Sequence, residues 1–204
     1  TGSNDSTRSM LGPVQYDWLI NELDNSSNQW NILGQQVMMA PLELFGSPLN
    51  NDQWDGYAWE RGKIYDHILA NNIENFVVLT GDIHTSWAND LPGSGYDAST
   101  GAGSIGVEFV VTSVTSPGLP LSVPSSTIQL ENDHMQFINL TDHGYMILDV
   151  NKQRAQADWF YFTDITVPST SDYFGDGWYV NDGERNLNQA SGLSTAASDY
   201  NCQY

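Results

Sequence analysis

The sequence predicts a layered α/β (α+β) protein with a mixed sheet, and three observations favour this class. In the first half, segments with helical spacing of apolar residues alternate with short apolar runs, whereas the second half holds mostly strand-like runs. The run 76–80 is almost continuously apolar, which is typical of a strand covered on both faces. Of the 204 residues, 40% are hydrophobic and 12% aromatic, enough for the core of one sizeable domain.

The first half is expected to hold two helices and two strands. The first helix begins near Pro13, which suits a first helical turn, and ends at the polar cluster 24–28. Residues 30–39 are predicted to form a buried strand, and a second helix follows Trp54–Tyr57 and ends at 71–72. The apolar positions that define the two helices are Val14, Trp18, Leu19 and Leu23 in the first, and Ile64, Ile68 and Leu69 in the second.

The second half is expected to consist mostly of strands. Residues 92–104 are rich in Gly, Ser and Asp and are predicted as a loop, followed by a strand over 107–114 and a short helical stretch near 128–131. Residues 144–150 and 155–162 form a predicted hairpin, because Asn151-Lys152 interrupts them. Little regular structure is expected in the last forty residues.

The charge balance limits the possible partners. Six Lys and Arg stand against 25 Asp and Glu, giving a formal net charge of -19. Such a surface repels nucleic-acid phosphates and anionic lipids, so neither is an expected partner. No run is long and apolar enough to span a membrane. The surplus carboxylates favour solubility in a salty or extracellular medium, and some of them could also hold divalent cations.

The two ends of the chain carry few signals. Cys202 is the single cysteine, so no disulfide within the chain is expected; it either pairs with another chain or is an inert thiol. The chain opens Thr-Gly-Ser without an initiator Met or an apolar signal core. We therefore expect that processing has removed an upstream part or that the chain is one piece of a larger molecule.

The segment Gly81-Asp82-Ile83-His84 carries the strongest chemical signal. It follows the buried run 76–80, and the carboxyl ends of strands are where α/β sheets place their ligands. Gly81 would let the backbone turn sharply, and the side chains of Asp82 and His84 could then converge on one point. One carboxylate and one imidazole suit a transition metal or a mixed-metal centre. The alternative is an Asp that caps a turn beside a surface His.

Several ordered motifs resemble those of the PhoD-like alkaline phosphatase/phosphodiesterase family. The resemblance covers roughly residues 8–162. In chain order the motifs are Arg8-x-Met10-Leu11-Gly12 with Gln15 and Trp18-Leu19, Trp54-Asp55-Gly56-Tyr57 with Arg61, VVLTGDIHTSWANDL, Val107-Glu108-Phe109 with Thr112-Ser113 and Ser116-Pro117-Gly118, Asn132-x-His134, and Asp142-His143-Gly144-Tyr145 with Asp149-Val150.

The resemblance implies a fold and a chemistry. The fold would be a four-layer metallophosphatase core, a β-sandwich flanked by helices, of which this chain supplies the carboxyl-terminal half. Residues 1–168 would belong to that domain and 169–204 would be an aromatic, acidic extension packed on it. The activity would be hydrolysis of phosphate mono- or diesters by an exported enzyme, secreted or periplasmic, with calcium and iron as its metals. Asp82 and His84 would then be metal ligands and catalytic residues.

The resemblance also implies that part of the site is missing. The family's other metal ligands lie in an amino-terminal half that has no match here. Since a metal-dependent phosphoesterase needs several ligands, we expect an amino-terminal fragment or second chain as a partner. The alternative is a non-catalytic structural or assembly subunit that retains the phosphatase fold.

Other residues are weaker candidates. Arg61 could grip a phosphoryl group, or pair internally with a carboxylate. Trp87 and Asn89 could shape the substrate pocket or, together with Asp90, orient the metal ligands. His134 and His143 are more typical of structural histidines. An acidic set near the carboxyl end could hold calcium or simply be solvated; it comprises Asp172, Asp176, Asn181, Asp182 and Glu184.

Overall fold

A five-stranded mixed sheet forms the centre of the molecule. The computed structural model describes residues 4–118, 123–168 and 171–195; Cys202 lies outside them. The strand order is β1-β4-β6-β5-β7. The strands β1, β4 and β6 run parallel, and β5 runs antiparallel to both of its neighbours. Their bounds are β1 Asn31–Gly34, β4 Phe76–Thr80, β5 Ser86–Asp97, β6 Ala102–Val110 and β7 Met135–Asn139.

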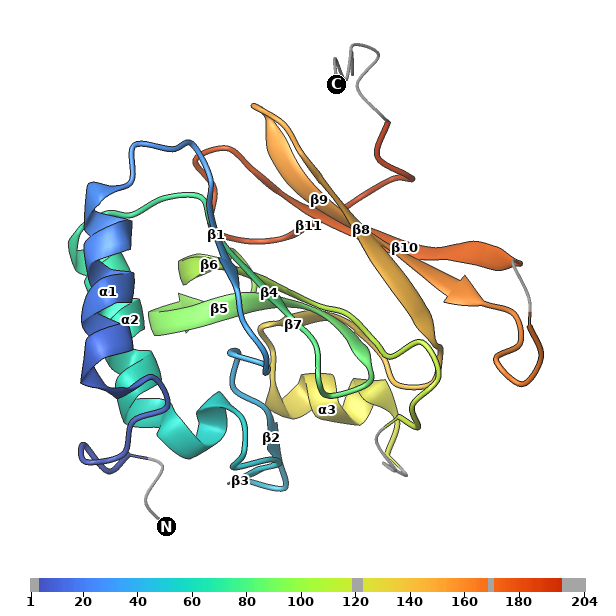
Figure 1. Cartoon of the computed structure of the whole chain (residues 1–204), viewed down its shortest axis with the longest axis horizontal. Coiled ribbons are helices and arrows are strands. Elements are labelled where there is room, and N and C mark those ends of the chain that lie inside the picture. The colour runs from blue at the N-terminus through green and yellow to red at the C-terminus, as the bar shows by residue number, and fades with distance from the viewer. Residues whose placement is uncertain (1–3, 119–122, 169–170, 196–204) are drawn as a thin grey trace.

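Helices cover one face of this sheet. Figure 1 shows α1 (Gly12–Asn25) and α2 (Ala58–Ala70) side by side on that face. A 3₁₀ turn, η1 (Trp54–Tyr57), leads into α2, and α3 (Ser125–Glu131) precedes β7. The core beneath them includes Leu19, Leu23, Ile64, Ile68, Val78 and Ile128. Val14 and Trp18, expected on the buried face of the first helix, are instead 83% and 56% exposed.

A second sheet covers the opposite face. It is antiparallel with the order β11-β10-β9-β8, and Figure 1 shows it on the side of the first sheet away from α1 and α2. Its strands are β8 Gly144–Val150, β9 Arg154–Phe162, β10 Asp172–Asn181 and β11 Asn188–Gln189. Trp159 is fully buried between the sheets, and its indole N–H donates to the Val110 carbonyl at 3.0 Å. The described residues therefore form three layers: the helices, the five-stranded sheet and the antiparallel sheet.

The layered α/β class is confirmed, but several segments differ from expectation. The predicted loop 92–104 instead holds the outer part of the β5–β6 hairpin, and β7 was not predicted. The expectation of little regular structure near the carboxyl end was wrong, since β10 pairs with β9 along its length. A small hairpin, β2 (Glu43–Leu44) with β3 (Ser47–Pro48), lies between the predicted strand 30–39 and the second helix.

The predicted strand 30–39 is also shorter than expected. Only residues 31–34 pair with β4, and the chain from Gln35 to Leu42 is irregular although Met38, Met39, Ala40 and Leu42 are buried. A buried irregular backbone needs hydrogen-bond partners from elsewhere. Side chains provide them along residues 38–43, which we call the core strap.

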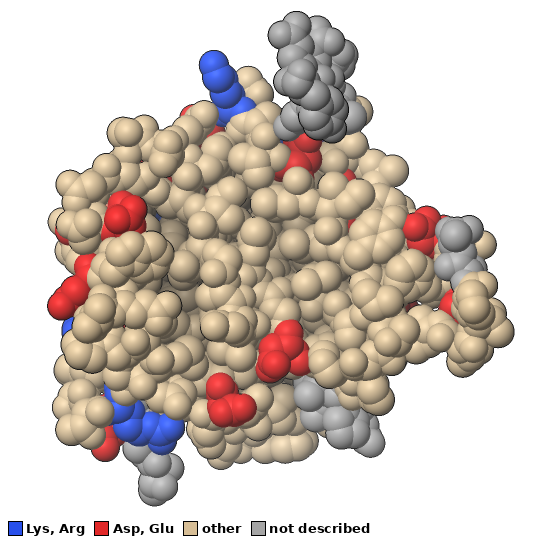
Figure 2. All heavy atoms as spheres, viewed as in Figure 1, with Lys and Arg blue, Asp and Glu red and all other residues tan. Residues whose placement is uncertain are grey.

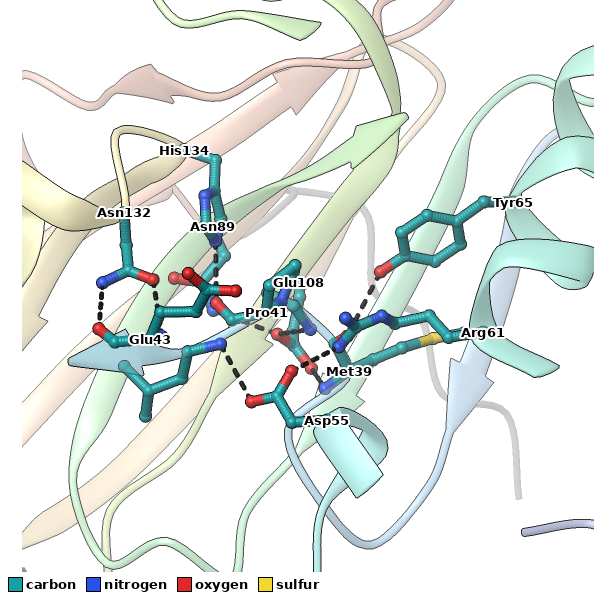
Figure 3. Close-up of polar contacts among 12 residues, drawn as sticks. Met39, Pro41, Glu43, Asp55, Arg61, Tyr65, Asn89, Glu108, Asn132 and His134 are labelled. Atoms are coloured by element: carbon teal, nitrogen blue, oxygen red, sulfur yellow. Dashed lines mark hydrogen bonds and ion pairs between the residues drawn. The ribbon is translucent and has the colours of Figure 1, made fainter. Parts of the chain in front are cut away.

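Glu108 on β6 holds the centre of the core strap, as Figure 3 shows. Its carboxylate accepts the N–H groups of Met39 at 2.6 Å and Ala40 at 3.0 Å. The side chains of Asn89 and Thr80 donate to it at 3.0 and 3.3 Å. Glu108 is fully buried, and burial raises the pKa of its carboxyl group above the ordinary value even though these donors oppose the shift.

Other side chains bond further backbone groups of the core strap (Figure 3). Asp55 accepts the Leu42 N–H at 3.0 Å, and His134 Nε2 lies 2.9 Å from the Pro41 carbonyl. Asn132 bonds both the N–H and the carbonyl of Glu43, and Arg61 donates to the Met39 carbonyl. Four of the family-like motifs thus contribute side chains that bond the core strap, and their role here is structural.

Candidate metal centre

The loop that joins β4 to β5 carries Asp82 and His84 at the carboxyl end of a central strand. Ile83, between them, is buried and anchors the loop, while Asp82 is exposed and His84 is half-buried. The Ile83 N–H donates to the Gly81 carbonyl at 2.8 Å, which closes a three-residue turn around Asp82. The sequence alternation therefore places both polar side chains on the outside of an anchored loop.

Both candidate ligands have left-handed backbone conformations. The φ angles are 68° at Asp82 and 60° at His84, a region that residues other than glycine seldom occupy. Gly81, where the sequence predicted the sharp turn, does not have a positive φ, and a Cβ there would meet Val111 only at 3.7 Å. The sharp turn thus falls on the two polar residues. Strain of this kind persists only where the surrounding structure holds it, and it concentrates at functional sites.

The imidazole of His84 is oriented by a backbone carbonyl. Its Nδ1 lies 2.8 Å from the Pro117 oxygen. A carbonyl oxygen can only accept, so Nδ1 carries the hydrogen and Nε2 of the neutral ring carries the lone pair. Metal-binding histidines are commonly oriented in this way by a backbone carbonyl.

The chemistry of this donor pair fits a metal ion, but the pair is incomplete. An exposed carboxylate and an imidazole with a free Nε2 suit a transition metal or a mixed centre. Across residues 4–118, 123–168 and 171–195, no three His, Cys, Asp or Glu side chains gather closely enough to hold a metal. The acidic set near the carboxyl end, expected as a possible calcium site, lies within these ranges.

Arg61 lies in the interior and not beside Asp82. Its guanidinium is 2.7 Å from the Asp55 carboxylate, and both side chains are largely buried. This is the internal ion pair that the sequence left open as an alternative. Burial raises the pKa of Asp55, and the charge of Arg61 acts against that rise.

Trp87 and Asn89 are likewise inside the protein. Both are fully buried on β5. The Trp87 indole donates to the Thr85 hydroxyl at 2.6 Å, next to His84, and Asn89 donates to Glu108. Of the proposed site residues, Asp82 and His84 thus lie on the outside of the β4–β5 loop, whereas Arg61, Trp87 and Asn89 lie inside the protein.

The other histidines have defined partners. His134 is buried against the Pro41 carbonyl, and burial lowers its pKa to about 4. His143 Nδ1 lies 3.0 Å from the Ser113 hydroxyl, in the loop that follows β6. Two contributors were missed from the sequence, the Pro117 carbonyl and Thr112, and the only signal of either was its place in a family-like motif.

Comparisons with known proteins agree with this architecture. The model of the PhoD-like phosphatase family matches residues 1–159. Alkaline phosphatase D of Bacillus subtilis (strain 168) is 37% identical over 175 residues, covering 83% of this chain and 29% of the relative. A solved structure described as "Structure of PhoD" superposes with a TM-score of 0.83 at 32% identity, covering 94% of this chain and 37% of that one.

A shorter match links the chain to a putative lipase, ATG15, of Vanderwaltozyma polyspora. It is 41% identical over 54 residues, 26% of this chain and 9% of that relative. The present sequence has no GxSxG nucleophile elbow.

The layered α/β fold and the polar loop at the end of β4 define the class as a phosphatase-type α/β protein. The chain belongs to the PhoD-like phosphatase family. It spans only about a third of the length of the relatives that it matches.

Proposed function

We propose that this chain takes part in metal-dependent hydrolysis of phosphate mono- or diesters, with Asp82 and His84 as metal ligands and catalytic residues. The observation that carries the proposal is the Asp82–His84 loop: an exposed carboxylate and an imidazole with a free Nε2, at the carboxyl end of β4. Membership of the PhoD-like phosphatase family supports the reaction class.

The two residues would hold the ion in different ways. Asp82 would offer a hard anionic oxygen and His84 a neutral nitrogen, a combination that suits iron at the nitrogen and calcium or iron at the oxygen. The chemistry that such an ion supplies when bound is polarisation of the phosphoryl oxygens and a lower pKa for an attacking water. By accepting the hydrogen bond from Nδ1, the Pro117 carbonyl would keep His84 Nε2 turned toward the ion.

An amino-terminal fragment or a second chain would supply the remaining metal ligands. The proposal is supported by the number of candidate ligands, since no three His, Cys, Asp or Glu side chains gather among the described residues and a hydrolytic centre needs several. The limited span of the chain relative to its relatives is consistent with it. Arg61, Trp87 and Asn89 would act from the interior, by holding the core strap and the strand that follows His84.

We further propose a location outside the cytoplasm, secreted or periplasmic. The net charge of -19 suits a salty or extracellular medium. On the face in Figure 2, carboxylates are scattered, and Lys and Arg lie only near its margins. None of the helices in the described ranges combines the length and the apolar character that crossing a bilayer requires.

The proposal is tested with Asp82→Asn and His84→Gln in protein purified under native conditions. Hydrolysis of p-nitrophenyl phosphate and bis-p-nitrophenyl phosphate and bound metal should both fall sharply, whereas Asp17→Asn, an exposed carboxylate of α1, should change neither. Native mass spectrometry of the same material should show an additional polypeptide. A lone 204-residue species with full activity would exclude the second polypeptide, and active Asp82 and His84 variants would exclude the site.

The alternative is a non-catalytic assembly subunit with the phosphatase fold. The same low number of candidate ligands favours it. In that case replacing Asp82 would not reduce the phosphoesterase activity of any preparation that contains the chain. This would hold with or without an associated polypeptide.

A further inference from the structure

We propose that Thr112 is a positioning residue, whose hydroxyl holds the backbone of His84 so that its imidazole faces the candidate metal position. This inference rests on the proposed role of His84 as a ligand. Thr112 lies two residues beyond the end of β6 and is 6% exposed, so it would not touch a substrate or metal itself.

The Thr112 hydroxyl lies between two loops. Its Oγ1 is 3.1 Å from the His84 carbonyl oxygen and 3.0 Å from the Asp142 carbonyl oxygen. A hydroxyl has one hydrogen to donate, so the two carbonyls share a single donor. Removing the hydroxyl would leave both carbonyls without it, one of them on the candidate ligand.

The segment that carries Thr112 also holds the ring of His84. The Val111 N–H donates to the Thr80 carbonyl at 2.9 Å, which fixes the start of the segment against β4. Pro117 accepts from His84 Nδ1, and a Cβ added to Gly118 would come within 3.4 Å of the His84 carbonyl oxygen. His84 is therefore held at its backbone and at its ring by the same eight-residue stretch, 111–118.

Because the backbone of His84 is strained, its contact with the Thr112 hydroxyl affects the direction of the imidazole. With φ at 60°, His84 is in a conformation that an L-residue leaves when its surroundings allow it. A return to negative φ would rotate the side chain about the backbone and move Nε2 away from its present direction. The Thr112 hydroxyl opposes that return by bonding the carbonyl that would move.

The test measures Co²⁺ binding to the 204-residue chain, because Co²⁺ accepts both imidazole and carboxylate ligands. Binding is followed through the imidazole NMR signals of His84, so no catalytic activity is needed. Thr112→Val removes the hydroxyl, and Thr112→Ser retains it. Ser104→Ala is the matched control: the Ser104 hydroxyl is also buried and bonds two carbonyls, those of Gly106 at 2.9 Å and Leu91 at 3.3 Å.

We expect Thr112→Val to raise the Co²⁺ dissociation constant by roughly 10-fold, the lower end of the usual effect of losing a group that orients a ligand. Thr112→Ser should restore wild-type affinity, and Ser104→Ala should lower thermal stability without weakening Co²⁺ binding. Equal affinity in wild type and Thr112→Val, or equal losses in Thr112→Val and Ser104→Ala, would overturn the inference. Co²⁺ binding by wild type that is unaffected by Asp82→Asn would instead count against the proposed site.

Discussion

The carbonyl oxygen of Pro117 lies 2.8 Å from Nδ1 of His84, and this contact determines which ring nitrogen can bind a ligand. Because the carbonyl needs a hydrogen from Nδ1, the lone pair is on Nε2. The two residues are 33 positions apart in the sequence and meet because the loops after β4 and β6 lie at the same edge of the sheet.

Two substitutions of Asp82 should separate the effect of losing its carboxylate from the effect of its strained backbone conformation. Asp82→Gly and Asp82→Ala both remove the donor, so both should abolish Co²⁺ binding. Glycine adopts a positive φ without a penalty, so Asp82→Ala should have a free energy of unfolding lower than that of Asp82→Gly by about 1 kcal/mol. Urea denaturation measures the difference. At Asp17 in α1 the order should reverse by about 1 kcal/mol, because alanine is the better helix former.

Replacing Glu108 should destabilise the whole domain. The amide of Glu108→Gln would place an N–H against Met39 or Ala40, whose N–H groups now donate to the carboxylate. The expected loss is about 2–3 kcal/mol in the free energy of unfolding, the usual cost of unsatisfied buried donors. Urea unfolding tests it against Glu22→Gln, an exposed change on α1. Equal stabilities of the two variants would show that the core strap does not depend on Glu108.

A substitution at Arg61 distinguishes its role in an internal ion pair from a role in phosphate contact. Arg61→Met would leave the buried carboxylate of Asp55 unpaired, so stability should fall by about 3 kcal/mol. KM for p-nitrophenyl phosphate should not change, because the guanidinium is not at the surface of the site. A large rise in KM with unchanged stability would assign Arg61 to the substrate instead.

His134 should make the protein sensitive to acid. Burial lowers its folded-state pKa to about 4 from the ordinary value of 6.5, so the unfolded chain binds the proton more tightly. The stability that His134 contributes is complete above about pH 6.5 and is lost as the pH falls through about 4. Thermal unfolding of His134→Gln between pH 4 and 6.5 should therefore depend less on pH than wild type. A steeper acid dependence in the variant would contradict this assignment.

Asp90 should make stability depend on pH in the direction opposite to that of His134, over an overlapping pH range. Burial raises its folded-state pKa to about 6 from 3.8, although Tyr96 and the Leu187 N–H donate to it. The folded protein thus binds this proton more tightly, and the contribution of Asp90 to stability falls as the pH rises from about 4 to 6. In Asp90→Asn, stability should consequently increase more steeply with pH over that range than in wild type. Parallel pH profiles would show that Asp90 does not titrate in this way.

The sequence was informative where periodicity and burial coincide. The strand Phe76–Thr80 was predicted because its continuous apolar run is buried, and the hairpin of β8 and β9 because Asn151-Lys152 interrupts two strand-like runs. β5 was missed because its buried residues include Ser86, Asn89 and Asp90, and a polar residue is buried only when distant partners bond it. β10 was missed because Gly175, Asp176 and Gly177 interrupt its apolar pattern.

The candidate site shows the same limit. Asp82 and His84 were predictable, because residue type and position after a strand both indicate a ligand site. The contacts of Thr112 and Pro117 with His84 were not, because they join a side chain or carbonyl to a backbone group far along the chain. Arg61 illustrates the converse: its residue type suits a phosphate contact, yet Asp55, six positions earlier, is its partner.

The central claim is tested most directly by chelation of the natively purified protein. Hydrolysis of bis-p-nitrophenyl phosphate and p-nitrophenyl phosphate is measured before EDTA treatment, after complete removal of metal, and after addition of calcium and iron. The account predicts loss of activity on chelation, recovery with the metals, and no recovery in Asp82→Asn or His84→Gln. Unchanged phosphoesterase activity after complete removal of metal would contradict it.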